Sequence, residues 1–330
     1  MSSSPHVHSP EEVPGAMRAV VYALIPAALA GIWFFGINGV RVIALSMIGC
    51  AFFEWGWQRL LKKPSSVGDW SALVTGLLLA MNLPATTPSW MVLLGALVAI
   101  VLAKQIYGGL GYNPFNPALV ARVFLLISFP VQLTNWALPG GASGWFTVDA
   151  ATGATPLGAI KEAISLGTPL SELNLAPLTD LFIGNRSGSL GEVSVLFLAL
   201  GGLYLVWRKI ISWHIPASFI LTVFVFTGIA HWASPERYAP PMFHVLTGGL
   251  WIGAVFMATD WVSSPVTKKG MLIFGFGCGL LTAVIRLWGG YPEGVSFAIL
   301  LMNAAVPLID RYTKPRVFGT RKTYEEAKAA

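Results

Sequence analysis

The chain has 330 residues, of which 55% are hydrophobic and only 11% are charged. Because soluble proteins carry about 25% charged residues, this composition excludes an ordinary soluble domain and predicts an integral membrane protein. The formal net charge of +6 is explained by membrane orientation, so it gives no reason to expect a nucleic-acid partner.

Ten apolar segments are candidates for membrane spans, each of which needs about 20 apolar residues when it is helical. We therefore expect an all-α integral membrane protein with about ten transmembrane helices. A tail at 1–17 precedes them and a tail at 311–330 follows them. The approximate spans are 18–36, 39–58, 70–84, 90–107, 115–137, 190–207, 213–232, 241–259, 270–288 and 294–310.

The basic residues predict the orientation of these spans, because lysine and arginine are enriched in cytoplasmic segments. With a cytoplasmic N-terminus, fifteen basic residues fall on the inner side and five on the outer side, and Arg122 lies inside a span. Both tails are then cytoplasmic, and the loop 138–189 lies on the outer face. The five outer residues are Arg41, Lys161, Arg186, Arg237 and Arg286.

The sequence predicts no metal site. Cys50 and Cys278, the two cysteines of the chain, both lie inside predicted spans, which excludes a CxxC metal or iron–sulfur motif. His6 and His8 have no third ligand nearby, so we interpret them as part of a solvated tail.

Two short segments have the character of helices that break inside the membrane. Asp69 to Pro88 is barely long enough to cross, contains Thr75-Gly76 and reaches a proline at Pro84. The segment from His244 to Asp260 contains Thr247-Gly248 in the same way. A helix can be interrupted at membrane depth only where protein neighbours satisfy its backbone groups.

A second pair of motifs suggests that the chain contains an inverted repeat. Tyr107-Gly108-Gly109 precedes the fifth span, and Trp288-Gly289-Gly290 precedes the tenth. Five spans separate the members of each pair, and an odd number inverts the second copy. We therefore expect a first five-helix repeat at 18–137 and a second at 190–310.

The loop at 138–189 is rich in Gly, Ser, Thr and Pro and too polar to span a membrane. Within it, Asp149 to Leu157 reads D-A-A-T-G-A-T-P-L, and Thr155-Pro156 is typical of a helix N-cap followed by proline at the first helical position. An anion on the Thr155 hydroxyl would meet the free N–H groups of the first turn, while Gly153 and Ala154 leave room beside it. The alternative is a plain threonine cap in a surface turn.

The pattern D-x-x-[ST]-G-A-T-x-L resembles the flavinylation motif of the NqrB/RnfD family of membrane redox subunits. The resemblance continues over most of the chain, through stretches at Gly108 to Pro117, Asp69 to Pro84, Met257 to Pro265 and Gly289 to Asn303. It implies that a flavin transferase joins FMN to Thr155 by a phosphoester bond. Asp149, Thr152, Gly153 and Ala154 would then form the recognition frame.

The RnfD branch of the family fits better than the NqrB branch, because NqrB has a longer cytoplasmic N-terminal extension and the first span here begins near residue 18. This resemblance implies an electron-carrier subunit of a bacterial inner-membrane complex that couples electron transfer between ferredoxin and NAD to translocation of Na⁺ or H⁺. Its partners would be the other Rnf subunits (A, B, C, E and G), with membrane lipid around them. A second, noncovalent flavin such as riboflavin is compatible with it.

The interrupted helices and glycine turns of both halves predict a central site for an ion or a second flavin at their interface. Its candidate residues are Gly108, Gly109, Asn113, Asn116, Gly289, Gly290, Asp260 and Glu293. The alternative for the glycines is tight turns between spans, and for the carboxylates it is solvation at span ends. Arg122 should face the bundle interior or extend to the inner surface, and the sequence gives it no functional role.

Two other functions remain open from the sequence. The first is an NqrB-like subunit of a Na⁺-translocating quinone reductase. The second is a small-solute channel, because inverted five-helix repeats also build urea- and ammonium-channel-like folds, and fold does not determine function. The T-G-A-T segment separates these possibilities, since a channel has no use for it.

Overall fold

The computed structural model describes residues 13–140, 152–167, 176–192 and 194–314. Within these ranges the chain is mostly helical, and its strands are limited to β1 (Trp136–Ala137) and β2 (Thr152–Gly153). The expected all-α class is therefore confirmed for the described chain. Asp149 and most of both predicted tails lie outside the described residues.

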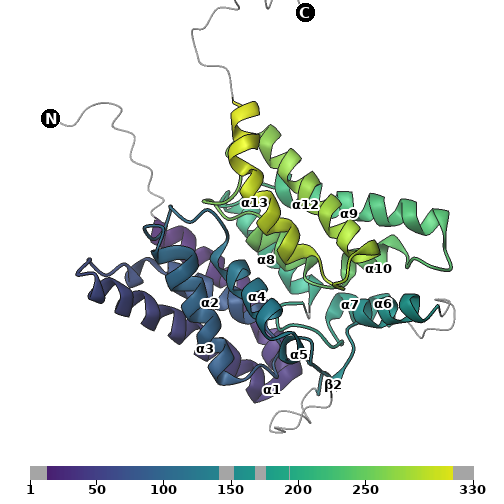
Figure 1. The fold of residues 1–330 in the computed structure, drawn as a ribbon, viewed down its shortest axis with the longest axis horizontal. Coiled ribbons are helices and arrows are strands. Elements are labelled where there is room, and N and C mark those ends of the chain that lie inside the picture. Colours follow the sequence, from purple (N-terminus) through teal and green to yellow (C-terminus); the bar gives the residue numbers. More distant parts are fainter. Residues whose placement is uncertain (1–12, 141–151, 168–175, 193, 315–330) are drawn as a thin grey trace, which may run out of the picture.

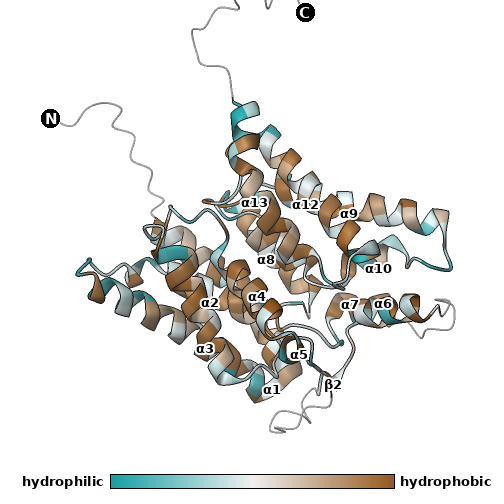
Figure 2. Cartoon of the chain, viewed as in Figure 1, coloured by the Kyte–Doolittle hydropathy of each residue, from teal (hydrophilic) through white to brown (hydrophobic). Residues whose placement is uncertain are grey.

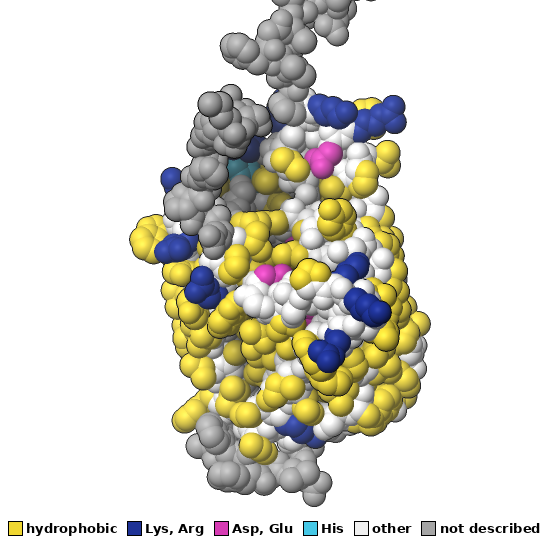
Figure 3. Space-filling model, turned by 90° about the vertical axis from the view of Figure 1, so that its left-hand side faces the viewer, with side chains coloured by type: hydrophobic (Ala, Val, Ile, Leu, Met, Phe, Trp, Pro, Cys, Tyr) yellow, Lys and Arg dark blue, Asp and Glu magenta, His cyan; other side chains and the backbone are white. Residues whose placement is uncertain are grey.

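Four described helices are long and apolar enough to cross a membrane: α1 (Val13–Leu60), α9 (His214–Ala233), α12 (Lys268–Trp288) and α13 (Val295–Tyr312). The shorter apolar segments are α2 (Ser71–Met81), α3 (Ser89–Leu97) with the π-helix η2 (Val98–Gln105), α4 (Pro117–Ser128) and α8 (Val195–Trp207). Apolar residues run along these helices (Figure 2), and hydrophobic side chains cover most of the face in Figure 3. The chain is a multi-pass membrane protein.

The helices α1 to α4 form one group, and α8 to α13 lie beside it (Figure 1). The first two predicted spans meet at Gly36, whose backbone (φ 60, ψ −142) divides α1 into two helical stretches. Glycine adopts this left-handed conformation without steric cost. The inverted relation between the two groups, and the span boundaries at 18–137 and 190–310, remain predictions.

Helix α2 contains Thr75-Gly76 and ends just before Pro84, as the sequence predicts for this short segment. The helix runs through both residues without interruption and ends at Met81. A Cβ atom on Gly76 would lie 2.7 Å from the Cα atom of Met47, so this glycine lets α2 pack closely against α1. After Met81 the helix is interrupted, and Asn82 to Ala85 form a buried turn.

The predicted break in the second group is confirmed at Thr247-Gly248. Helix α10 (Pro241–Leu246) ends there, Gly248 has φ +68, and the chain continues as α11 (Leu250–Ile252) and the π-helix η5 (Gly253–Met257). Two buried arginines satisfy the carbonyl groups at the end of α10. Arg186 donates to the carbonyl of Leu246, and Arg286 donates to those of His244 and Thr247.

The described parts of the segment between the two groups form short elements that pack on the second group. β1 and β2 pair antiparallel with Trp136 opposite Gly153, and the helices α6 (Pro156–Leu166) and α7 (Leu178–Ile183) follow. The apolar side of α6 joins a core cluster that contains Leu157, Ile160, Val195 and Phe243. The helix predicted after Pro156 is therefore present and packs on the second group.

Buried salt bridges and hydrogen bonds hold several of the basic residues that were used to predict orientation. Lys104 is 2% exposed and lies 2.7 Å from the carboxylate of Glu54, which is fully buried. Arg186 and Arg286 are buried as well. These three residues therefore do not report on membrane sidedness, and the orientation depends on the exposed basic residues of the loops.

Candidate functional site

Thr155 occupies the N-cap of α6, as the sequence predicts. Its backbone is extended (φ −67, ψ 155), its Oγ1 atom accepts a hydrogen bond of 3.0 Å from the N–H of Gly158, and Pro156 stands at the first helical position. The residue is only 5% exposed. Its hydroxyl therefore lies at the positive end of a helix and under cover of protein.

A cavity of about 200 Å³ opens beside this hydroxyl, and we call it the Thr155 cavity. Helix α4, the turn after α2, the start of α6 and the segment before α13 contribute its walls. Its lining residues include Asn82, Arg122, Leu126, Trp136, Ala154, Thr155, Glu162, Tyr291 and Glu293. Aromatic, apolar and charged side chains thus meet around one hydroxyl.

Two contacts fix α6 over this cavity. The Nζ atom of Lys161 donates to the carbonyl oxygens of Tyr291 at 2.7 Å and Ile285 at 3.2 Å, which ties α6 to the end of α12. The Ser187 hydroxyl donates to the carbonyl of Ala154 at 2.7 Å. Partial burial lowers the pKa of Lys161. Thr155 is therefore held between two anchored segments.

Gly153 lies against Leu138. A Cβ atom at Gly153 would lie 2.9 Å from Cδ2 of Leu138, so the missing side chain makes room for Leu138. Ala154 is exposed and does line the cavity. Thr152, two residues before Ala154 in the chain, belongs to β2.

Arg122 faces the interior, which confirms one of the two predicted orientations. It is 7% exposed and forms a short ion pair with Glu293, while its Nη1 atom donates to Oδ1 of Asn82 at 2.7 Å. Glu192 lies 3.9 Å from its Nη2 atom. The sequence analysis missed Glu192. A glutamate at the start of an apolar helix was the available signal, and it does not reveal a partner 70 residues away.

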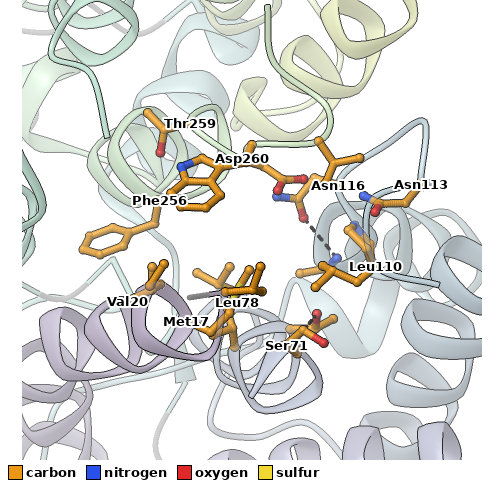
Figure 4. Close-up of a pocket in the computed structure, with 18 of the residues that line it drawn as sticks. Met17, Val20, Ser71, Leu78, Leu110, Asn113, Asn116, Phe256, Thr259 and Asp260 are labelled. Carbon is orange, nitrogen blue, oxygen red and sulfur yellow. Dashed lines mark hydrogen bonds between the residues drawn. The ribbon is translucent and has the colours of Figure 1, made fainter. Parts of the chain in front are cut away.

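A second cavity, of about 340 Å³, lies at the other end of α2. We call it the Asn116 cavity. Residues from both groups of helices line it (Figure 4), among them Met17, Ser71, Leu78, Asn113, Asn116, Phe256 and Asp260. Asn116 caps α4 with its side-chain oxygen and donates from Nδ2 to the carbonyl of Met257 at 3.3 Å. This cavity is mainly apolar with a few polar groups, as is typical of small-molecule sites.

The candidates for one central site divide between these two cavities. Asn113, Asn116 and Asp260 line the Asn116 cavity, and Glu293 lines the Thr155 cavity. Gly108 and Gly109 form the turn after η2 with positive φ, whereas Gly289 caps α12. Ser71 and Asn82, at opposite ends of α2, each line a different cavity. The structure therefore brings Asn113, Asn116 and Asp260 together and places Glu293 at the opposite end of α2.

Comparison with known proteins identifies the family to which the sequence is similar. The model of the NQR2, RnfD, RnfE family matches residues 1–319. The D subunit of the Na⁺-translocating ferredoxin:NAD⁺ oxidoreductase complex of Acetobacterium woodii is 45% identical over 332 residues, which cover 100% of this chain and 98% of that protein.

Two further relatives are also similar to this chain over nearly the whole length of both proteins. The D subunit of the proton-translocating ferredoxin:NAD⁺ oxidoreductase complex of Clostridium ljungdahlii is 46% identical, over 98% of this chain and 96% of that protein. The D subunit of the ion-translocating oxidoreductase complex of Halorhodospira halophila is 40% identical, over 96% of this chain and 94% of that protein. The similarity thus extends over nearly the whole length of each protein.

Proposed function

The chain belongs to the NQR2, RnfD, RnfE family, and from this membership we propose that it is the D subunit of an ion-translocating ferredoxin:NAD⁺ oxidoreductase complex. In this role it carries electrons on an FMN that a phosphoester bond joins to Thr155. The relatives reported above are all subunits of oxidoreductase complexes, which favours an electron carrier over a small-solute channel. Because all three are D subunits, they also favour the RnfD branch over NqrB.

One observation carries this proposal: the hydroxyl of Thr155 lies at a helix N-terminus and opens on a cavity. A phosphate on this oxygen would meet the N–H groups of the first turn and the positive end of the helix dipole. Lys161 and Ser187 would hold the attachment point, and Trp136 and Tyr291 would flank the ring system. When bound, the flavin supplies the redox chemistry, and the chain supplies position and electrostatics.

The Asn116 cavity supports a second, noncovalent flavin such as riboflavin. Its volume falls within the range of about 300–1,000 Å³ that is usual for small-molecule sites. Asn113, Asn116 and Asp260 supply donors and acceptors at one end, and apolar side chains such as Met17 and Phe256 supply the rest of the lining. An ion held by Asp260 is the alternative occupant.

The proposal includes the setting of the subunit. Both termini lie on the cytoplasmic face of the bacterial inner membrane, about ten spans form two inverted repeats, and the segment with Thr155 lies on the outer face. A flavin transferase acts on Thr155 there, and the other Rnf subunits (A, B, C, E and G) are the partners. The relatives include both a Na⁺- and a proton-translocating complex, so either ion is compatible with this similarity.

The direct test is flavin fluorescence of the denatured, purified protein on a gel. We expect a fluorescent band for the native chain and for Ser165→Ala, which removes an exposed hydroxyl later in α6, and none for Thr155→Ala. The Thr155→Ala protein should still fold, because losing one N-cap costs about 1 kcal/mol. Persistence of covalent flavin in Thr155→Ala would refute the assignment.

A further inference from the structure

Two carboxyl groups, those of Glu192 and Glu293, flank the guanidinium of Arg122. Of these three residues, Arg122 and Glu293 line the Thr155 cavity. Glu293 forms the short ion pair with the Nη2 atom of Arg122, and Oε1 of Glu192 lies 3.9 Å from the same nitrogen. Glu192 is 3% exposed. The three side chains come from α4, from the segment before α8 and from the segment before α13. The fold thus brings two acids to one cation away from water.

One oxygen of each carboxyl group is left without a hydrogen-bond partner in the described part of the chain. These atoms are Oε1 of Glu192 and Oε1 of Glu293, and both are buried. A buried carboxylate without donors is costly, and two carboxylates that share one site cannot both ionise easily. A proton on one acid would supply the missing donor for the other. The arrangement therefore calls for one proton between the two groups.

The other charges around the pair do not replace that proton. Arg186 donates to the carbonyls of Leu246 and Glu192, and Arg286 donates to those of His244 and Thr247, so both guanidinium groups are engaged with backbone. The ring of His244 lies beside Arg286 and is buried. Arg122 is the cation that pairs with the two acids.

The two acids differ in their surroundings. Glu293 forms the short ion pair with the Nη2 atom of Arg122, so its charge has a close partner. Oε1 of Glu192 lies 3.9 Å from the same nitrogen and has no hydrogen-bond partner among the described residues. Glu293 is therefore the ionised partner of Arg122, and Glu192 is the acid that carries the proton.

We propose that Glu192 and Glu293 form a proton-binding site whose occupancy is linked to the charge in the Thr155 cavity. The linkage to the charge in the cavity rests on the proposed function, whereas the proton-binding site itself does not. An electron that reaches the flavin from the preceding carrier of the complex adds negative charge beside Glu293, and Glu192 then holds or takes up a proton from water more strongly. No bond forms between the acids and the flavin. The site compensates charge where the outer-face cofactor is reduced.

The first test needs no flavin. Infrared spectra of the Thr155→Ala protein at neutral pH should contain the C=O band of a protonated carboxylic acid, which shifts in D₂O and disappears at alkaline pH. The further change Glu192→Gln should remove this band, because glutamine imitates the protonated acid without titrating. Glu162→Gln is the matched control, since Glu162 lines the same cavity but is exposed, and it should leave the band unchanged.

The second test uses the complete complex with its covalent flavin. In the pH range where Glu192 titrates, the midpoint potential of that flavin should change with pH more steeply than protonation of the flavin itself requires, and Glu192→Gln should remove this additional slope. Absence of the infrared band, or its persistence in Glu192→Gln, would overturn the proton site while leaving covalent flavin intact. Absence of covalent flavin would instead overturn the proposed function, and the infrared result would still decide the proton site. The shift of the C=O band in D₂O is measured without any glutamate variant, so it remains a test of the protonated acid even if Glu192→Gln misfolds.

Discussion

Arg122 is the residue on which the interior of the Thr155 cavity depends. It satisfies Glu293, approaches Glu192 and donates to Asn82 at the end of α2, so one guanidinium joins four segments of the chain. Arginine suits this position because its planar group presents five donors in a fixed fork. This buried cation is therefore one of the links between the two groups of helices.

Removing that cation should be strongly destabilising. We expect Arg122→Met to lower the free energy of unfolding by about 3–5 kcal/mol, because it leaves a buried carboxylate without compensation. Arg122→Met combined with Glu293→Gln should recover part of this loss, since no buried charge then remains unpaired. Thermal unfolding in detergent measures both variants. Equal stability of Arg122→Met and the native chain would show that the ion pair makes no net contribution.

At the residue scale the sequence predicted local chemistry well and long-range partners poorly. The cap at Thr155 follows from the pair Thr155-Pro156, and the chain around it confirms the geometry. Glu192 went unrecognised because its importance comes from Arg122 and Glu293, which are distant in sequence and meet only in the folded chain. No local pattern encodes such a pairing.

The interrupted helix α10 to α11 is the element that supports the segment with Thr155. Its break at Gly248 exposes carbonyl groups, and Arg186 and Arg286 satisfy them. Leu157 of α6 packs at the same point, because a Cβ atom on Gly248 would lie 2.9 Å from its Cδ1 atom and 2.7 Å from Nη2 of Arg286. The break, the arginines and α6 therefore form one unit.

Gly248→Ala should disturb this unit. A side chain at positive φ costs roughly 1–2 kcal/mol, and the displacement of Arg286 and Leu157 adds to it. We expect a lower unfolding temperature and faster proteolysis within α6. Gly290→Ala is the control, because nothing lies within 4 Å of its added Cβ atom, and it should behave as the native chain. Identical rates of proteolysis in the two variants would show that the stability of α6 does not depend on the turn at Gly248.

The two Thr-Gly pairs show where sequence reasoning reaches its limit at the scale of elements. Thr247-Gly248 interrupts its helix, while Thr75-Gly76 lies inside an intact one. The same dipeptide serves two purposes, since Gly76 permits close contact with Met47 and Gly248 permits a left-handed turn. Only the neighbours decide between them.

For the molecule as a whole, composition predicted the membrane class and the helical content, because apolar length alone distinguishes spans from loops. All ten predicted segments contain helix in the described chain. The placement of Asn116 and Glu293 at two separate cavities was not predictable, because it depends on how the helices of the two groups pack together. Tertiary packing, and not periodicity, sets those positions.

The predicted orientation can be tested with exposed loop residues. Single cysteines introduced at Glu236 and at Lys269, both exposed, should differ in a background with Cys50 and Cys278 replaced by alanine. An impermeant thiol reagent applied to intact cells should label only the protein changed at Glu236, because the basic residues predict that loop outside. Labelling only at Lys269 would invert the topology and place Thr155 on the cytoplasmic face.

The central claim is that Thr155 carries the flavin, and mass spectrometry of the digested native protein tests it most directly. We predict that the peptide containing Thr155 gains the mass of FMN less one water, and that fragmentation places the addition on Thr155. An unmodified peptide, or an addition on Thr152, would contradict the account.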